Sequence, residues 1–574
     1  MTFNRKLSDI NALWCALIME ELVRNGVEYC CLASGSRNAP LIHAAAAENR
    51  LQKQVHFDER GLGFLALGIA KATRKPVVII TTSGTAVANL YPAIIEAAMT
   101  DTPLLVISAD RPPELLDTGA NQTINQSAMF NHYPVQEVQL PCPDTAIPPQ
   151  WLLSTLDQGI AKLMEGGVVH FNAHLREPLY PVDDCPDWSS YLAPVRRWIL
   201  TNRPWTYYKK SAWGMLDEAD TLIDRLYETK GVLVAGQLSM EEASAVANLA
   251  EKLGWPLLVD VQSQLQGHSL SLPHVDLLLN NPSVCERLNQ ANTVLQFGGR
   301  LVSKRLSQWL SGGQREHYYF VDSRVARQDP ACNQSLRLQA RIVDLCRFLE
   351  ASLPEPRAQS PWLAQLMEYG IRCRRALNRQ LSSALTEVSV VRHVAEQQRQ
   401  GQCLFIGNSM PIRLIDSLSA IRLQGEVITN RGASGIDGLI ATAAGVAATG
   451  RDITLLLGDL SFLHDLNSLA MLREQSVTVV LLNNDGGSIF NMLSISHEGD
   501  LFKRYFQVSH GLDAEQVAAM FGIRYASPCQ PETFAHCYDA AKVSDESWII
   551  EVKTPPKEAT DFFSNALDMA GELW

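Results

Sequence analysis

An aspartate and an asparagine that follow two apolar runs could together hold a divalent cation. Asp459 follows the apolar residues 453–457, and Asn484 follows the apolar residues 477–482. The residues between them, 466–472, have leucines at helical spacing, so the whole stretch predicts a β-α-β unit. Because a right-handed crossover ends two parallel strands at the same edge of a sheet, we expect the two side chains to lie close together.

The residue types at this predicted edge suit magnesium and a diphosphate. Mg²⁺ prefers hard oxygen ligands and keeps positions open for phosphate and water. A carboxylate, an amide oxygen and a glycine carbonyl supply such ligands, which predicts a metal clamp of Asp459, Asn484 and the carbonyl of a nearby glycine. The glycines would also let backbone amides approach a phosphate closely. The same residues could instead be only a helix cap and a turn, and this stretch alone leaves both interpretations open.

The clamp resembles the metal–diphosphate signature of thiamine-diphosphate (ThDP) enzymes. One position departs from that signature, because Leu460 stands where most of the superfamily has glycine. The resemblance implies that ThDP and its metal are bound by Gly458, Asp459, Leu460, Ser461, Asn484, Gly486, Gly487, Ser488 and Ile489.

Length and charge limit the class of protein. A chain of 574 residues is too long for one core and suggests three domains of about 190 residues each. Hydrophobic residues make up 46% and charged residues 19%, which is typical of a globular protein. The formal net charge of −12 argues against a general nucleic-acid or membrane-surface binder, so anionic substrates would need local arginines.

Cysteine usage and the N-terminus favour a cytoplasmic protein. The twelve cysteines form no CxxC pair and no Cys/His zinc spacing, which favours reduced thiols. The apolar run 12–19 is followed at once by Glu20 and Glu21 and predicts an amphipathic helix rather than a signal peptide. No uninterrupted apolar run approaches membrane-spanning length, so we expect no membrane insertion.

The first third of the chain alternates helix and strand. Predicted helices cover 11–24, 66–72 and 89–98, and predicted strands cover 26–32, 76–81 and 104–108. With Glu59 ahead of the small-residue helix and a Thr-Ser-Gly turn at 82–84, this series resembles the pyrimidine-binding domain of pyruvate oxidase-like ThDP enzymes. The resemblance implies that Glu59 is catalytic and exchanges a proton with N1′ of the aminopyrimidine. Taken singly, Glu59 would more often be a solvated carboxylate at a helix start.

The remaining two thirds continue as open α/β units. A proline- and tryptophan-rich connection at 194–210 leads into a middle unit that has no intact Gly-x-Gly-x-x-Gly fingerprint and no independent sign of FAD or a nucleotide. Prolines cluster near 352–362, and a helix at 390–398, with Ser389 as a possible cap, opens the last unit. We therefore predict an α/β fold with three open, mostly parallel sheets, in domains 1–190 (pyrimidine-binding), 191–355 (central) and 356–574 (diphosphate- and metal-binding).

Further motifs narrow the resemblance to one family. The motifs are Ser36-Arg37, Asp110-Arg111-Pro112-Pro113, Asn121-Gln122, Gly407 to Arg413, Asn430 to Gly438 and Gly458-Asp459-Leu460-Ser461. They are similar to those of the 2-succinyl-5-enolpyruvyl-6-hydroxy-3-cyclohexene-1-carboxylate synthases, the ThDP enzymes of menaquinone biosynthesis. The similarity covers essentially the whole chain, least securely the middle domain.

The family resemblance implies a reaction and a set of substrate contacts. The reaction is decarboxylation of 2-oxoglutarate with ThDP and Mg²⁺ or Mn²⁺, followed by addition of the succinyl carbanion equivalent to isochorismate. Both substrates are dicarboxylates, which arginine side chains bind bidentately. The resemblance places Ile436 in support of the bent cofactor and Ser409 beside cofactor and substrate. It assigns the remaining substrate contacts to Ser36, Arg37, Arg111, Asn121, Gln122, Lys304, Arg305, Arg413, Arg431, Ile489, Phe490 and Leu493.

Two other interpretations remain open at this point. One is another ThDP carboligase or decarboxylase, such as an acetolactate-synthase-like enzyme acting on pyruvate, although a monocarboxylate would not need Arg37, Arg111, Arg413 and Arg431 together. The other is a cofactor-sensing scaffold without catalysis. In the superfamily the glutamate and the metal clamp of one site come from different chains, so the resemblance also implies a homodimer or homotetramer.

Overall fold

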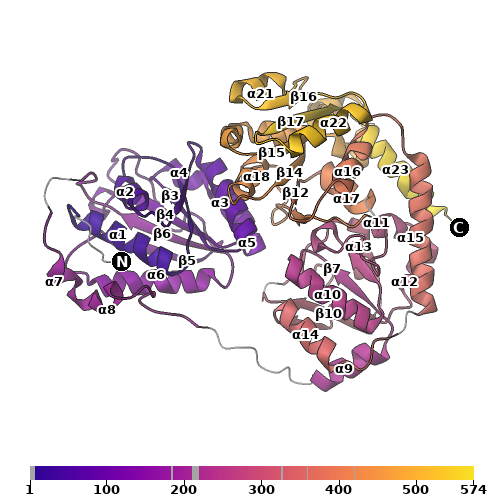
Figure 1. Cartoon of the computed structure of the whole chain (residues 1–574), viewed down its shortest axis with the longest axis horizontal. Coiled ribbons are helices and arrows are strands. Elements are labelled where there is room, and N and C mark those ends of the chain that lie inside the picture. The colour runs from indigo at the N-terminus through magenta and orange to yellow at the C-terminus, as the bar shows by residue number, and fades with distance from the viewer. Residues whose placement is uncertain are drawn as a thin grey trace. The chain divides into compact units, whose positions relative to one another are not determined.

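Three open parallel sheets organise the chain. The structure is a computed structural model that describes residues 7–181, 185–209, 219–313, 315–324, 327–357, 360–418 and 421–573. Every strand pair in these ranges is parallel. The predicted α/β class with three open sheets is confirmed (Figure 1).

The first sheet has the order β2-β1-β3-β4-β6-β5. Its strands are β1 (Tyr29–Leu32), β2 (Gln52–Val55), β3 (Val77–Thr81), β4 (Leu104–Asp110), β5 (Pro134–Leu140) and β6 (Val168–His174). Its main helices are α1 (Ile10–Arg24), α2 (Ala39–Ala47), α3 (Glu59–Thr73), α4 (Thr85–Asn89), α5 (Tyr91–Thr100) and α6 (Pro149–Leu163). The central strands β1, β3 and β4 are buried at every residue, as expected for parallel strands covered by helices on both faces.

Two predicted boundaries in this sheet were wrong. The strand predicted at 26–32 begins only at Tyr29, because Gly26 has φ +86° and turns the chain after α1. The helix predicted at 66–72 begins earlier, at Glu59, because the Asp58 side chain accepts a hydrogen bond from Arg60 N and caps it there. Glu59 is therefore the first residue of the helix rather than a residue ahead of it.

The second sheet has the order β11-β10-β9-β7-β8. Its strands are β7 (Gly231–Ala235), β8 (Leu257–Val259), β9 (Thr293–Phe297), β10 (His317–Asp322) and β11 (Leu336–Gln339). Its helices include α10 (Met240–Leu253), α11 (Val275–Leu278), α13 (Lys304–Gly312), α14 (Ile342–Ser352) and the long α15 (Pro361–Gln380). The connection predicted at 194–210 begins within short helical turns, and its last residue, Lys210, lies outside the described residues.

The third sheet has the order β13-β12-β14-β15-β17-β16. Its strands are β12 (Cys403–Ile406), β13 (Glu426–Ile428), β14 (Ile453–Gly458), β15 (Val477–Asn483), β16 (Arg524–Ala526) and β17 (Trp548–Lys553). Its helices include α16 (Glu387–Glu396), α17 (Met410–Leu418), α19 (Asp459–His464), α22 (Pro531–Lys542) and α23 (Glu558–Gly571). A further helix, α18 (Leu439–Ala447), lies between β13 and β14 in the chain. The helical pattern at 466–472 forms a 3₁₀ segment, Leu466–Glu474.

One predicted helix start in this sheet was wrong. The helix predicted at 390–398 begins at Glu387, and its cap is Thr386 rather than Ser389. Ser389 is the third helical residue and completes a capping box, in which Thr386 Oγ1 accepts from Ser389 N and Ser389 Oγ accepts from Thr386 N. The capping box places the Glu387 side chain at the start of α16.

The three sheets divide into two compact units. The first unit is Met1–Ala212 with Asn430–Arg451 and Leu463–Gln475, and the second is Trp213–Thr429 with Asp452–Phe462 and Ser476–Trp574. In the first unit α3 packs against α18, and a Cβ at Gly68 would lie 2.0 Å from Thr442 O. Glycine there allows the two helix backbones to approach closely. Within the described ranges, the helices are all too short or too polar to cross a membrane.

Candidate active site

The metal-clamp residues Asp459 and Asn484 directly follow the carboxyl ends of β14 and β15, two central strands of the third sheet. Strands β14 and β15 pair in parallel with Gly458 opposite Leu482, so the two chain ends leave the sheet side by side. The predicted adjacency of the two strand ends is thus confirmed. Asp459 is the first residue of α19 and is only 4% exposed. Its Oδ1 accepts from Leu460 N at 2.7 Å, and its Oδ2 accepts from Gly486 N at 2.8 Å.

The Asn484 side chain presents an unused oxygen. Its Nδ2 donates to Glu387 Oε1 at 2.8 Å, while its buried Oδ1 has no hydrogen-bond partner among the described residues. A buried amide oxygen without a partner is costly unless a ligand satisfies it. The residues present therefore fit a cation held beside Asp459.

The turn after Asn484 also suits an oxygen-coordinated metal. Gly486 has φ +124°, and a Cβ there would lie 2.1 Å from Gln507 O, so only glycine fits. Its carbonyl accepts from Ser488 N at 2.9 Å, which leaves a second lone pair on the oxygen. Within the described ranges, no three His, Cys, Asp or Glu side chains gather as a metal site. A cation here would rest on carboxylate, amide and carbonyl oxygens, which suits Mg²⁺ or Mn²⁺ better than Zn²⁺.

Two further side chains contact the clamp without having been predicted. His510 Nε2 lies 3.2 Å from Asp459 Oδ2, and Asp485 Oδ1 accepts from His510 N at 2.9 Å and from Gly511 N at 2.7 Å. Glu387 is buried, and burial raises the pKa of its carboxyl group to about 7. Neither residue stands in a recognisable motif, so only its contacts identify it.

Glu59 is the first residue of α3, which lies in the first unit together with the loop before α18. The Glu59 side chain is half-buried, and the Phe64 ring lies where a Cβ on Gly438 would collide with it. Ile436, on the loop before α18, is 37% exposed. An apolar side chain held open to solvent on a tightly packed loop can support a bound organic group.

The loop that carries Arg431 is held by α3 and α5. Glu96 Oε1 accepts from Gly432 N at 2.9 Å, and Glu96 Oε2 accepts from Ala433 N at 2.7 Å. Lys71 Nζ lies 3.3 Å from Glu96 Oε1 and donates to Asn430 Oδ1 at 2.7 Å. Burial lowers the pKa of Lys71, while the charge of Glu96 opposes that shift. Neither Lys71 nor Glu96 was predicted to serve the site.

Arg37 and Arg111 form a positively charged pair in the first unit. Arg111 is buried, and Asp110 Oδ1 accepts from its backbone N at 2.8 Å. Burial and then the nearby charge of Arg37 lower the pKa of Arg111. Arg37 Nη1 donates to Leu175 O at 3.0 Å and lies 3.4 Å from Glu177 Oε1. Because the charge of Arg37 is felt at Arg111, the two arginines are a suitable pair for a carboxylate.

Ser83 joins Arg111 to Gln122. Arg111 Nη1 donates to Ser83 Oγ, which itself donates to Gln122 O at 3.1 Å. Gln122 Nε2 returns a hydrogen bond to Ser83 O at 2.9 Å. The neighbouring Asn121 is exposed, as is Ser36, whose Oγ lies 3.4 Å from Tyr180 OH. The Thr-Ser-Gly turn at 82–84 thus organises two predicted substrate residues.

Asp276 links the two helices that carry the predicted basic residues Arg305 and Arg413 of the second unit. Arg305 Nη1 lies 3.2 Å from Asp276 Oδ2, which also accepts from Ser417 Oγ at 3.0 Å. Ser417 belongs to α17, the helix that carries Arg413, whose Nη1 donates to Ser409 O at 2.6 Å. Lys304, at the start of α13, is exposed. The structure therefore connects the two helices that carry Arg305 and Arg413.

The predicted apolar wall follows the clamp on a short 3₁₀ turn, Ser488–Met492. Phe490 packs edge-on against Phe506 with ring centroids 5.8 Å apart. Ile489 is half-buried against the core of the second unit, and Leu493 is 53% exposed. These three side chains supply apolar surface directly after the clamp residues in the chain.

Comparisons with known proteins cover nearly the whole chain. Thiamine pyrophosphate is another name for ThDP, and three domain models of its enzymes match. They are the N-terminal TPP binding domain over residues 15–129, the middle domain over 189–406 and the C-terminal TPP binding domain over 417–552.

Curated relatives match at nearly full length. A 2-succinyl-5-enolpyruvyl-6-hydroxy-3-cyclohexene-1-carboxylate synthase of Shewanella frigidimarina is 45% identical over 571 residues, which is 96% of this chain and 97% of the relative. Enzymes of the same name from Shewanella loihica and Aeromonas salmonicida are 46% and 44% identical, each over 97% of this chain, and over 97% and 98% of their own lengths. The chain belongs to this synthase family. It is a ThDP-dependent enzyme of the transferase type, as the sequence motifs predicted.

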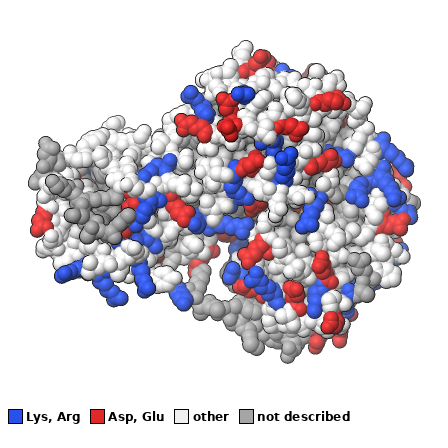
Figure 2. Space-filling model, in the orientation of Figure 1, with Lys and Arg blue, Asp and Glu red and all other residues white. Residues whose placement is uncertain are grey.

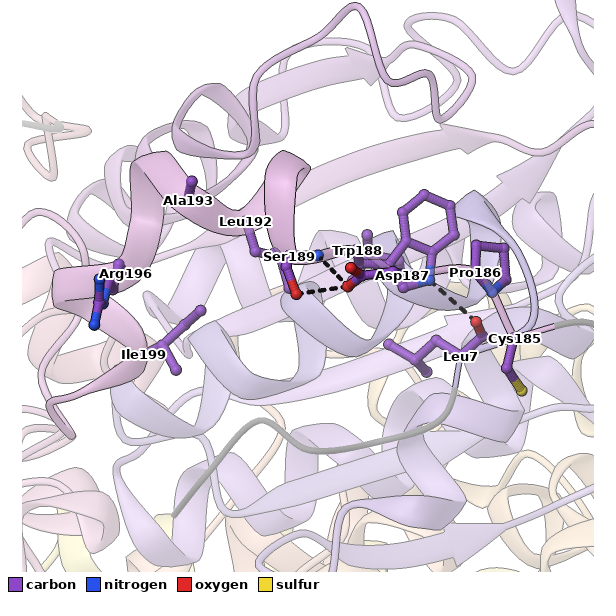
Figure 3. A pocket seen from close by; sticks show the side chains of 11 residues that line it. Leu7, Cys185, Pro186, Asp187, Trp188, Ser189, Leu192, Ala193, Arg196 and Ile199 are labelled. Atoms are coloured by element: carbon purple, nitrogen blue, oxygen red, sulfur yellow. Dashed lines mark hydrogen bonds between the residues drawn. The ribbon is translucent and has the colours of Figure 1, made fainter.

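Neither the charged face in view nor the cavity beside Trp188 marks the predicted site. Figure 2 shows acidic and basic side chains intermixed on the visible face, so anion attraction must be local. A cavity of about 590 Å³ in the first unit is lined by Leu7 and by residues around Trp188 (Figure 3). None of the predicted site residues lines this cavity. The buried oxygen of Asn484 is a stronger indicator of the site than cavity size.

Proposed function

We propose that the chain decarboxylates 2-oxoglutarate with ThDP and Mg²⁺ and adds the succinyl carbanion equivalent to isochorismate. The product is 2-succinyl-5-enolpyruvyl-6-hydroxy-3-cyclohexene-1-carboxylate, an intermediate of menaquinone biosynthesis. The observation that carries the proposal is the buried Asn484 Oδ1, which has no hydrogen-bond partner among the described residues, in a chain of this synthase family. The names of the relatives favour this activity over an acetolactate-synthase-like reaction with pyruvate.

The clamp residues would hold the metal and the diphosphate. Asp459, Asn484 and the Gly486 carbonyl supply oxygen ligands for Mg²⁺ or Mn²⁺, which both accept such ligands. Gly458, Leu460, Ser461, Gly487, Ser488 and Ile489 would surround the cofactor with backbone amides and apolar contacts. Ser409 belongs to the same proposed set. Bound ThDP supplies an electron sink that makes loss of CO₂ from a 2-oxo acid possible.

Glu59 would exchange a proton with N1′ of the aminopyrimidine. Asp58 caps α3, because its side chain accepts a hydrogen bond from Arg60 N. The carboxyl group of Glu59, the first residue of the helix, is therefore not needed as the cap. Ile436 would support the same ring from the loop before α18. General acid–base assistance of this kind is worth about 10²- to 10⁴-fold in rate.

The basic residues would bind the substrate carboxylates. Arg37 and Arg111, joined through Ser83 to Gln122, form one anion-binding group in the first unit. The other proposed substrate contacts are Ser36, Asn121, Lys304, Arg305, Ser409, Arg413, Arg431, Ile489, Phe490 and Leu493. The dicarboxylate character of both substrates accounts for so many arginines in an acidic chain.

A CO₂-release assay tests this function. With ThDP and Mg²⁺, the chain should release CO₂ from 2-oxoglutarate and consume isochorismate when both substrates are present. Pyruvate in place of 2-oxoglutarate should support much slower release. Rapid turnover of pyruvate with none of 2-oxoglutarate would replace the proposal with an acetolactate-synthase-like activity.

The same proposal includes the setting of the enzyme. We infer a cytoplasmic homodimer or homotetramer in which Glu59 of one chain and the metal clamp of another serve one cofactor. Its partners would be small molecules only. The proposed domains remain 1–190, 191–355 and 356–574.

A further inference from the structure

Glu387 is a buried carboxylate placed directly against the metal clamp. It is the first residue of α16 and is only 1% exposed. Its backbone N donates to Glu558 Oε2 at 3.0 Å, and the capping box of Thr386 and Ser389 holds the helix start around it. The position of its side chain is therefore determined by the fold rather than by solvent.

The two oxygens of the Glu387 carboxylate differ in their hydrogen bonds. Oε1 accepts from Asn484 Nδ2 at 2.8 Å and from Thr554 Oγ1 at 3.1 Å. Oε2 is buried and has no hydrogen-bond partner in the described part of the chain. Oε1 is the acceptor in both the Asn484 and the Thr554 hydrogen bonds, so it holds the NH₂ side of the Asn484 amide.

The amide of an asparagine has two chemically opposite ends, and only the oxygen can bind a cation. If Asn484 were flipped, its Oδ1 would face the Glu387 oxygens, and its NH₂ group would point toward the cation. Both contacts would be repulsive, so the hydrogen bond to Glu387 selects the orientation that exposes Oδ1. Groups behind a metal ligand commonly orient it in this way, and their loss costs about 10- to 100-fold in metal affinity.

We propose that Glu387 is a positioning residue, which holds the Asn484 amide so that Oδ1 faces the metal of the cofactor site. The inference rests on the proposed function, because it assumes that Asn484 is a metal ligand. It adds a residue that makes no contact with the cation itself and acts only through Asn484.

Metal affinity tests the proposal without using activity. Mn²⁺ binding in the presence of saturating ThDP can be measured by electron paramagnetic resonance on wild type, Glu387→Leu, Glu387→Gln and Thr554→Val. We expect Glu387→Leu to weaken Mn²⁺ binding by about 10- to 100-fold. Glu387→Gln keeps an oxygen acceptor for Asn484 Nδ2 and should bind Mn²⁺ nearly as wild type does. Thr554→Val removes the other hydrogen bond to Oε1 and should leave Mn²⁺ affinity unchanged.

A reciprocal exchange of groups tests the orientation directly. Asn484→Asp should weaken Mn²⁺ binding, because the new carboxylate would face Glu387. Adding Glu387→Gln should restore binding, since the glutamine NH₂ can then donate to Asp and leave its other oxygen toward the metal. Thermal unfolding without cofactor checks that each variant folds.

Three results would overturn the inference. Wild-type affinity in Glu387→Leu would show that Asn484 needs no positioning. An equal loss in Glu387→Gln and Glu387→Leu would show that the charge of Glu387 matters rather than the orientation of the amide. Failure of the wild-type chain to bind Mn²⁺ even with ThDP would instead reject the proposed function, and the inference with it.

Discussion

At the scale of single residues, Asp459 is both a hydrogen-bond acceptor for the backbone and a proposed metal ligand, and substitution can separate the two roles. Its carboxylate accepts backbone hydrogen bonds from Leu460 and Gly486, and it also supplies the only charged oxygen of the proposed clamp. Loss of the hydrogen bonds should cost about 1 kcal/mol each in stability, which a folded domain tolerates. Loss of the charged ligand should have a much larger effect on cofactor binding.

We expect Asp459→Ala to fold but to lose Mg²⁺-dependent ThDP binding. Isothermal titration calorimetry with ThDP, with and without Mg²⁺, measures this directly. Asp500→Ala, which removes an exposed aspartate of the same unit, is the matched control and should bind as wild type does. Unchanged ThDP affinity in Asp459→Ala would remove this residue from the site.

The Glu59 carboxyl group can be tested by its proton rather than by its size. Glu59→Gln keeps the shape and the hydrogen-bonding groups but removes the ionisable proton. We expect near-normal ThDP binding and a C2-proton exchange that is slower by about 10²-fold or more. Nuclear magnetic resonance after acid quench measures the exchange, with ThDP affinity as the internal control. Exchange at the wild-type rate would contradict the role of Glu59.

Of the two arginines on α17 and on the loop before α18, we expect one to affect a single step of the reaction and the other to affect both steps. A charge-assisted bidentate contact is worth about 1.5–3 kcal/mol, or roughly 10- to 150-fold in apparent affinity. We expect Arg413→Ala to raise the KM for isochorismate by that factor and to leave decarboxylation of 2-oxoglutarate alone largely intact. Arg431→Ala, on the loop that also carries Ile436, should impair both steps.

CO₂ release with each substrate varied in turn separates these outcomes. Arg372→Ala serves as a control, because this exposed arginine of α15 pairs with Glu368 four residues earlier on the same helix. If Arg413→Ala lost 2-oxoglutarate turnover while the KM for isochorismate stayed unchanged, the two carboxylate pockets would be assigned in reverse.

At the scale of elements, the loop after β13 depends on α5. Both oxygens of Glu96 accept backbone amides of this loop, at Gly432 and Ala433, and Lys71 balances the buried charge. Gly432 is needed for this approach, because a Cβ there would lie 2.8 Å from Glu96 Oε2. The helix therefore determines where the loop, and with it Arg431, is held.

We expect Glu96→Gln to loosen this loop without unfolding the chain. The glutamine keeps one acceptor oxygen but loses the second backbone hydrogen bond and the charge that faces Lys71. The unfolding free energy in urea should fall by about 1–3 kcal/mol, the cost of an unsatisfied buried partner. The KM values should change in the same direction as in Arg431→Ala, by a smaller factor. KM values equal to those of wild type would show that Arg431 does not depend on this contact.

At the scale of the whole molecule, the proposed sharing of one site between chains can be tested by mixing inactive variants. Glu59→Gln and Asp459→Ala each damage a different half of the site. If the two halves come from different chains, a hybrid dimer contains one site with both lesions and one intact site. If both come from one chain, no hybrid contains an intact site.

Mixing the two variants should therefore restore activity. With random exchange of chains, about a quarter of the wild-type CO₂ release is expected, because half of the dimers are hybrids with one intact site each. Each variant mixed with itself under the same conditions is the control. A mixture as inactive as its components, with hybrid formation verified by native mass spectrometry of tagged chains, would place both halves of the site in one chain.

Local sequence patterns were enough to predict the three sheets and the edge at which Asp459 and Asn484 meet. Buried parallel strands are short apolar runs, and a crossover between them has a fixed hand, so residues that follow two such runs must emerge at one edge. The motifs with Arg37, Arg111, Arg413 and Arg431 are also short runs of consecutive residues, which can be recognised without a structure. They identified the family before any contact was known.

Helix starts were predicted less well, because they depend on which polar side chain finds a backbone amide. Asp58 caps α3 one residue before Glu59, and Thr386 rather than Ser389 caps α16. In each case several polar residues stood close together in the sequence. Only the folded backbone decided which of them became the cap.

The partners of the site residues were decided by tertiary structure alone. Glu387, Glu96 and His510 belong to no motif, and each acts on a residue that lies far away in the sequence. Glu387 is next to Asn484 only because α16 packs at the carboxyl end of β15, and Glu96 reaches Gly432 only because α5 lies beside the loop after β13. A carboxylate in a sequence is equally suited to solvent, an ion pair or a metal ligand. Burial and the groups that surround it in the fold decide which of these it becomes.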